Sequence, residues 1–247
     1  MTEPRLVLAP NPSPMTLEGT NTWILGSRRT VVVDPGPDDP AHLDRVAEEA
    51  GGVALVLLTH GHPDHSAGAK TLAQRLGVPV RAVDRAHRLG EEGLSDGEHV
   101  TVDDLVVTVL ATPGHSSDHV CFVLPEQGVV LTGDHVLGRG TTVVAHPDGR
   151  MRDYLDSLSR LADVGATRLL PGHGPVVDNP AEVIAYYVRH REERLREVEA
   201  AVLAGARTAR EVVERVYADV DRALWGAAEQ SVRAQLDLLV ETGRVTL

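Results

Sequence analysis

A cluster of metal-binding side chains placed directly after an apolar run constrains this 247-residue chain more than any other feature. The run VALVLL, residues 53–58, is typical of a buried strand, and the loop THGHPDHSAG, residues 59–68, follows it. Alternate residues of an extended segment point to the same side, so His60 and His62 are expected to reach one metal ion. The tight spacing after a strand favours a metal loop over a polar loop that is merely rich in histidine.

The same loop is expected to change direction at Pro63, because proline fixes its own backbone angle and favours a turn. Asp64 and His65 would then leave the chain in a direction different from that of the first two histidines. Imidazole and carboxylate groups bind borderline divalent metals such as zinc. One short segment is therefore predicted to supply ligands to two adjacent ions.

Three later strands each end in a further metal-type side chain. VVTVLATPGH ends at His115, VVLTGD ends at Asp134, and RLLPGH ends at His173. Taken alone, a loop histidine or a turn aspartate has an equally good structural explanation. In layered α/β proteins, however, ligands collect at the carboxyl ends of strands. The joint occurrence therefore predicts one site with seven candidate ligands.

Charge and cysteine content exclude some classes of protein. The chain has 24 basic and 36 acidic residues and a net charge of −12, so composition gives no strong signal for DNA binding. Cys121 is the only cysteine and lies in a predicted strand, where a small buried side chain is expected. The first residues lack an apolar core of signal-peptide length, and no run of 18 apolar residues occurs. We therefore expect a cytoplasmic protein that does not bind membranes, and the oligomeric state is left open.

The order of elements predicts an α/β fold followed by a helical tail. Short β-type runs at 6–9, 22–25, 30–34, 53–58 and 78–83 alternate with predicted helices near 41–50 and 66–76, and 99–110 is expected to form a hairpin. The tail predicts one long helix over 179–205, two shorter helices within 208–220 and 227–245, and a terminal strand at RVTL.

The motifs HGHPDH, TPGH, TGD and PGHG closely resemble those of the metallo-β-lactamase fold superfamily. The resemblance implies an αββα sandwich over residues 1–178 and a C-terminal helical, winged-helix-like subdomain over 179–247. It also implies that Asp34 is a buried aspartate supporting the metal loop. The ligand sets that it implies are His60, His62 and His115 for a first ion, and Asp64, His65 and His173 for a second, with Asp134 bridging both.

A narrower resemblance covers nearly the whole chain. NPSPMTLEGTNTWILG, GDHVLGRGTT and LPGHGPVVDNP are similar to segments of the lactamase-β-like protein 2 group, whose animal member is an endoribonuclease acting on single-stranded RNA. Other relatives are described as glyoxalase-II-like hydrolases. The acidic tail without a basic helix favours a packing role for the winged-helix-like part over DNA binding.

The resemblance implies a metal-dependent hydrolase, expected to be an endoribonuclease or phosphodiesterase that uses a metal-bridging hydroxide. Asp64 is the expected catalytic residue, which would orient the hydroxide as well as bind an ion. One alternative is a thioester hydrolase of small acyl substrates, of the hydroxyacylglutathione-hydrolase type. The other is a non-enzymatic regulator that binds a partner. Two zinc ions per chain are the expected cofactors, with iron or manganese as alternatives.

Overall fold

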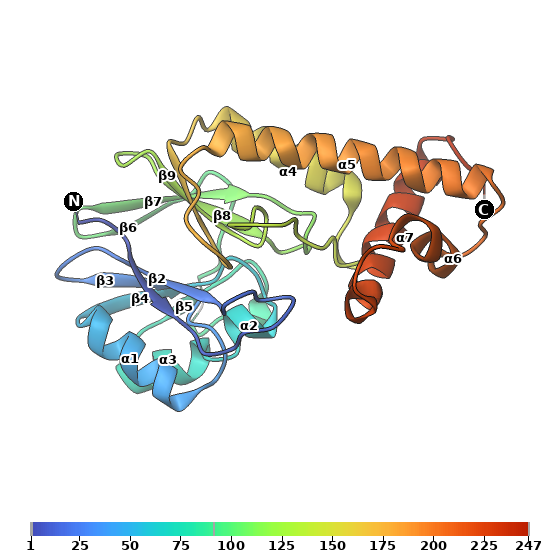
Figure 1. The fold of residues 1–247 in the computed structure, drawn as a ribbon. Coiled ribbons are helices and arrows are strands. Elements are labelled where there is room, and N and C mark those ends of the chain that lie inside the picture. Colours follow the sequence, from blue (N-terminus) through green and yellow to red (C-terminus); the bar gives the residue numbers. More distant parts are fainter. Residues whose placement is uncertain (1, 91, 247) are drawn as a thin grey trace. The chain divides into compact units, whose positions relative to one another are not determined.

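The computed structural model describes residues 2–90 and 92–246, and the chain divides into two compact units (Figure 1). The first unit comprises Met1–Ala111, Asp118–Gly140 and Ala166–Asp178. The second unit comprises Thr112–Ser117, Thr141–Gly165 and Asn179–Leu247. Two segments that precede residue 179 in the sequence thus group with the tail. A domain boundary between residues 178 and 179 stays a prediction.

The first unit contains two five-stranded sheets. The first has the order β1-β2-β3-β4-β5 and the second the order β10-β9-β8-β7-β6. Their strands are β1 Arg5–Leu8, β2 Asn21–Leu25, β3 Thr30–Val33, β4 Val53–Leu57, β5 Val80–Arg81, β6 His99–Val102, β7 Leu105–Ala111, β8 Val120–Leu124, β9 Val129–Gly133 and β10 Arg168–Pro171. The predicted strand at 78–83 is therefore shorter than expected, and the predicted hairpin is confirmed by the antiparallel pairing of β6 with β7.

Alternate side chains of the first sheet enter two different cores. Trp23, Val33 and Leu57 pack with apolar residues of the second sheet, which forms a core between the two sheets. Ile24 and Val56, which point the other way, pack with residues of helices α1, Pro40–Ala50, and α3, Ala69–Leu76. Successive side chains of a strand point to opposite faces of the sheet, so apolar residues at every position bury both faces of this sheet.

The chain between β4 and α3 carries the metal loop. A four-residue helix α2, Pro63–Ser66, begins one residue after His62, and α3 follows after a break at Gly68. The helix predicted near 66–76 therefore begins three residues later, at Ala69, and a Cβ at Gly68 would lie 2.8 Å from the carbonyl oxygen of Pro37, so only glycine lets the chain pass this close to that loop. A short 3₁₀ helix, η1 Arg85–His87, follows β5.

The second unit is helical. It contains α4 Met151–Asp163, α5 Pro180–Leu203, α6 Ala209–Val216, the 3₁₀ helix η2 Arg222–Leu224 and α7 Trp225–Glu241. The carboxyl end of α5 packs with α6 and α7 around Val202, Val213 and Leu239. The single long helix predicted after residue 179 is confirmed. None of the helices formed by the described residues has the length and hydropathy needed to cross a membrane.

The terminal strand predicted at RVTL is wrong for the residues that the structure describes. Residues 244–246 are irregular, and Leu247 lies outside the described residues. The backbone N–H groups of Arg244 and Val245 instead bond back to the carbonyl of Leu239 at the end of α7. A strand needs a partner strand, and in the described part of this unit no strand offers one.

Candidate metal centre

Asp34 anchors the metal loop from the end of the neighbouring strand β3. Its Oδ1 accepts from the backbone N–H of Thr59 at 2.8 Å, and its Oδ2 accepts from the Thr59 hydroxyl at 2.6 Å. The same Oδ2 accepts from Nδ1 of His65 at 2.9 Å. Asp34 is buried and has a φ of 50°, a left-handed conformation that aspartate tolerates better than most side chains do.

Four donor groups converge within the first unit. The ligand atoms of Asp64, His65, Asp134 and His173 all lie within 4.8 Å of one another. The two Nε2 atoms are 3.2 Å apart, and Nε2 of His173 lies 3.1 Å from Oδ2 of Asp64 and 3.4 Å from Oδ1 of Asp134. Nε2 of His65 lies 3.3 Å from Oδ1 of Asp134 and 3.6 Å from Oδ2 of Asp64. We call this set the second site.

Each of the two histidines uses its other nitrogen to fix the ring. Nδ1 of His65 donates to Asp34, and Nδ1 of His173 donates to the carbonyl of Gly19 at 3.1 Å. A carbonyl oxygen only accepts, so Nδ1 of His173 carries a hydrogen whatever the charge of the ring. In both rings Nε2 is therefore the nitrogen that takes or releases a proton, and both Nε2 atoms point at the same place. This is the arrangement in which a histidine binds a metal ion.

The spacing of the donors fits a tetrahedrally bound ion such as zinc. With ligands at roughly 2.0–2.1 Å from an ion, the edges of a tetrahedron are about 3.3–3.4 Å long. The five donor-to-donor distances range from 3.1 to 3.6 Å. Two nitrogens and two carboxylates in this spacing, largely shielded from water, suit a divalent cation.

Gly172 lies so close to two of these ligands that no side chain fits there. A Cβ at residue 172 would lie 2.7 Å from Cε1 of His65 and 2.8 Å from Oδ1 of Asp134. Gly133, at the end of β9, is equally confined, because its Cβ would lie 2.6 Å from the Thr59 hydroxyl. Bare backbone thus lets the end of β10 approach two ligands of the second site, and the end of β9 approach Thr59.

The electrostatics of the second site also favour a cation. Burial alone would lower the pKa of His173, but the charge of Asp134 and hydrogen bonds to Asp134 and Asp64 raise that pKa to about 9. Burial likewise opposes charge on His65, yet the charges of Asp134 and Asp34 hold its pKa well above the ordinary value. The two histidines in turn outweigh burial and keep the pKa of Asp134 well below its usual range. The negative charge of the carboxylates is thus balanced by protons on the two histidines when no metal ion is bound, and a bound cation would replace those protons.

His60 and His62 lie side by side, as the alternation of side chains in the loop predicts. Nε2 of His60 is 3.0 Å from Nδ1 of His62, and Nδ1 of His60 is 3.0 Å from the Thr59 hydroxyl. His60 is buried and His62 is partly exposed. The pair offers two imidazole nitrogens at a separation that one ion can bridge.

His115, the third ligand predicted for the first ion, belongs to the second unit. Its Nδ1 donates to the carbonyl of Val143 at 2.6 Å, so Nε2 is again the nitrogen suited to a metal. Its place beside His60 and His62 stays a prediction from the sequence. We call these three residues the first site.

Two supporting residues have roles that the sequence did not predict. Thr59 connects Asp34 to His60, because its hydroxyl donates to the carboxylate and lies beside the imidazole. Nε2 of His119 accepts from the backbone N–H of Asp134 at 3.2 Å. Its ring centre lies 5.1 Å from that of His60. His119 therefore supports the loop that carries Asp134.

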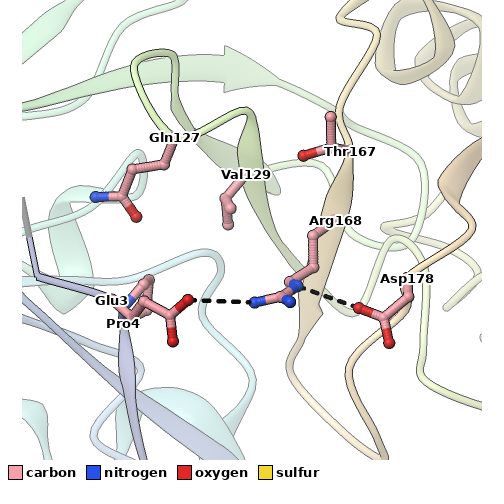
Figure 2. Close-up of a pocket in the computed structure, with 7 residues that line it drawn as sticks. All are labelled: Glu3, Pro4, Gln127, Val129, Thr167, Arg168 and Asp178. Atoms are coloured by element: carbon pink, nitrogen blue, oxygen red, sulfur yellow. Dashed lines mark hydrogen bonds and ion pairs between the residues drawn. The ribbon is translucent and has the colours of Figure 1, made fainter.

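The first unit also has a surface hollow of about 420 Å³ that is separate from these ligands (Figure 2). Val129 and Arg168 line it at the amino ends of β9 and β10, whereas Asp134 and His173 follow the carboxyl ends of the same strands. Arg168 lies between Glu3 at 4.0 Å and Asp178 at 3.1 Å. The Arg168 guanidinium is therefore paired with two carboxylates at this hollow.

Two known protein families match successive parts of the chain. Residues 15–173 match the metallo-beta-lactamase superfamily, and residues 208–246 match the beta-lactamase-associated winged helix domain. The beta-lactamase-like protein 2 homolog of Caenorhabditis elegans is 34% identical to this chain over an alignment of 253 positions. The alignment covers 97% of this chain and 84% of that protein.

Solved structures share the fold. The metallo-beta-lactamase family protein TTHA1429 from Thermus thermophilus has a TM-score of 0.83 and 26% identity, and the match covers 97% of this chain and 94% of that one. TTHA1623, solved in a di-iron-bound form, has a TM-score of 0.56 and 28% identity over 69% of this chain and 96% of that one. Metals are thus found in a protein of the same fold.

Proposed function

The chain belongs to the metallo-beta-lactamase superfamily, and we propose that it is a two-metal hydrolase that cuts phosphodiester bonds of single-stranded RNA. It has the α/β fold of that superfamily with two sheets and a C-terminal winged-helix domain, and its clusters of histidine and aspartate are suited to binding metals. The observation that carries the proposal is the convergence of Asp64, His65, Asp134 and His173, with both Nε2 atoms aimed at one point.

We assign Asp64, His65 and His173 to one ion and His60, His62 and His115 to the other, with Asp134 shared. Zinc is the proposed metal because imidazole nitrogens predominate, and the donor spacing fits its tetrahedral preference. When bound, two such ions would lower the pKa of bound water towards about 7 and neutralise negative charge that develops on the substrate.

The residues of the chain supply orientation and shielding. Asp34 and the Gly19 carbonyl keep the rings of His65 and His173 turned so that Nε2 faces the site. Asp64 is the one carboxylate of the second site that is partly exposed, so it can accept a hydrogen bond from an attacking water and hold that water towards the substrate. Asp134 is buried, and its lowered pKa keeps its carboxylate ionised in the site.

RNA as the substrate is supported by similarity over the whole chain to the β-lactamase-like protein 2 group rather than by charge. The net charge of −12 gives no general attraction to a polyanion. Phosphate would therefore be attracted mainly by the bound ions, which add positive charge at one point. A cytoplasmic location stays part of the proposal and accords with the single, buried Cys121.

The proposal is tested by offering metal-loaded protein three substrates in parallel: a short single-stranded RNA, the matching DNA and an acyl-glutathione thioester. We expect cleavage of RNA that stops when a chelator is added. Rapid turnover of the thioester without RNA cleavage would replace the proposal with the thioesterase alternative. Binding of metal without turnover of any substrate would favour a non-enzymatic regulator.

Asp64→Asn separates chemistry from substrate binding. The amide keeps the size and one oxygen but loses the charge that holds the attacking water, so the cleavage rate should fall by about 10²–10⁴. Affinity for RNA, measured by fluorescence polarisation, should change much less. Asp44→Asn is the matched control, because Asp44 is an exposed aspartate paired with Arg75 on the surface. An equal loss of binding and cleavage in Asp64→Asn would contradict the assigned role.

A further inference from the structure

His115 is held in place within the second unit by the segment 142–145. Its Nδ1 donates to the carbonyl of Val143 at 2.6 Å, and its own carbonyl accepts from the backbone N–H of Ala145 at 3.0 Å. The hydroxyl of Thr142 lies 3.2 Å from the same Nδ1. The direction in which Nε2 points is therefore set by the backbone of this segment.

The segment is in turn held by the C-terminal helices. The guanidinium of Arg191, on α5, donates to the carbonyl of Thr142. The hydroxyl of Ser231, on α7, accepts from the backbone N–H of Val144 at 3.1 Å. Both side chains are buried, with Arg191 only 4% exposed. Their bonds fall on the residues immediately before and after Val143, the residue that accepts from His115.

We propose that Arg191 and Ser231 are positioning residues for His115, so that α5 and α7 hold the one proposed metal ligand that belongs to the second unit. The inference rests on the proposed function, because it takes His115 to be a metal ligand. It gives the helical tail a task beyond packing. Changes in the tail would alter occupancy of the first site without touching a ligand.

A contribution to folding stability does not by itself account for a buried arginine at position 191. Its guanidinium stacks 5.0 Å over the ring of Tyr154, and its Nε finds no hydrogen-bond partner among the described residues. Burying a charge with few bonds is costly, and an apolar side chain of similar volume is often as stabilising or more so. The bond to the Thr142 carbonyl is what a methionine at this position could not make.

The test compares Arg191→Met with a matched change on the same helix. Arg194 stacks 4.9 Å over Tyr217, but it bonds to Glu197 and Val216 and not to the segment 142–145. Metal content is measured by mass spectrometry and affinity by competition with a chromogenic chelator. We expect Arg191→Met to bind one of its two ions about 10–100-fold more weakly, as loss of groups that orient ligands does. Arg194→Met should keep both ions.

Two further variants guard against misfolding and non-specific loss. Ser231→Ala removes only a hydroxyl and should weaken the same ion by about tenfold, while Arg191→Lys should restore part of the affinity. Adding Arg191→Met to His115→Ala should weaken metal binding no further. The inference is overturned if Arg191→Met keeps both ions at wild-type affinity, if Arg194→Met loses as much, or if the double variant loses more than His115→Ala. None of these measurements uses RNA, so failure of the proposed substrate would leave them unaffected.

Discussion

At the scale of single residues, the candidate ligands are recognisable from the sequence, whereas most of the residues that support them are not. His60, His62, Asp64 and His65 lie within six positions, so their spacing alone predicts a metal loop. The role of Thr59 depends on Asp34, which is 25 residues away, and the role of Arg191 depends on a carbonyl 49 residues away. A local pattern carries no information about such partners, because the sheet and the helices bring them together only after folding.

The raised pKa of His173 predicts how metal affinity depends on pH. The pKa is about 9 in the metal-free protein, above the ordinary value, so the ring carries a proton at pH 7. A metal ion requires the neutral ring, so binding releases that proton and becomes stronger as pH rises towards 9. Affinity of the second site should therefore rise about tenfold per pH unit for each proton displaced.

Calorimetric titration with zinc in buffers of different ionisation heat would count the protons released. Asp64→Asn provides a comparison, because removing one of the carboxylates that hydrogen-bond His173 should bring its pKa down and flatten the dependence on pH. An affinity that does not change between pH 6.5 and 8.5 in the wild type would contradict the assignment of His173 as a ligand.

At the scale of elements, the strand ends fix the site more firmly than the loops between them. β4, β9 and β10 deliver His60, Asp134 and His173 within a few residues of their carboxyl ends. Most strands were predictable from apolar runs, but the shortness of β5 within its predicted range and the irregular backbone of residues 244–246 were not. Pairing with a neighbouring strand, which single-sequence patterns do not report, decided both cases.

Gly172→Ala tests how closely the end of β10 must approach the second site. The added methyl would meet His65 and Asp134 at 2.7 and 2.8 Å, so one of these ligands must move. We expect the second ion to bind at least about tenfold more weakly while the protein stays folded. Gly226→Ala is the control, because a Cβ there meets nothing within 4 Å and alanine is favoured in a helix. Equal metal affinity in the two variants would show that metal binding does not depend on the close approach of residue 172 to His65 and Asp134.

At the scale of the whole molecule, the second unit gathers segments that the sequence separates widely. The loop with His115 is seated on α4, where the hydroxyl of Ser157 donates to the carbonyl of Pro113 at 2.8 Å. Gly114 packs so closely that a Cβ would lie 2.3 Å from Cα of Tyr154. The sequence predicts the helices after residue 179, but it predicts neither α4 nor the grouping of residues 112–117 and 141–165 with those helices.

A chain that ends at residue 178 should therefore not behave as a folded domain. It would lose α5 and α7, and with them the contacts of Arg191 and Ser231 to the segment 142–144. The buried face of α4, including Tyr154 and Leu158, would lose the helices of its own unit. Size-exclusion chromatography should show aggregation of the truncated chain. A monomeric truncated chain that binds two ions would contradict both this expectation and the proposed role of the tail.

This chain is expected to bind two metal ions, one at each of the two sites. Binding is tested most directly by anomalous difference maps from crystals of the zinc-loaded protein, with data collected on both sides of the zinc absorption edge. We predict two peaks per chain, one among Asp64, His65, Asp134 and His173 and one among His60, His62 and His115. A map with no peak at the second site, or with peaks only at other residues, would contradict the account.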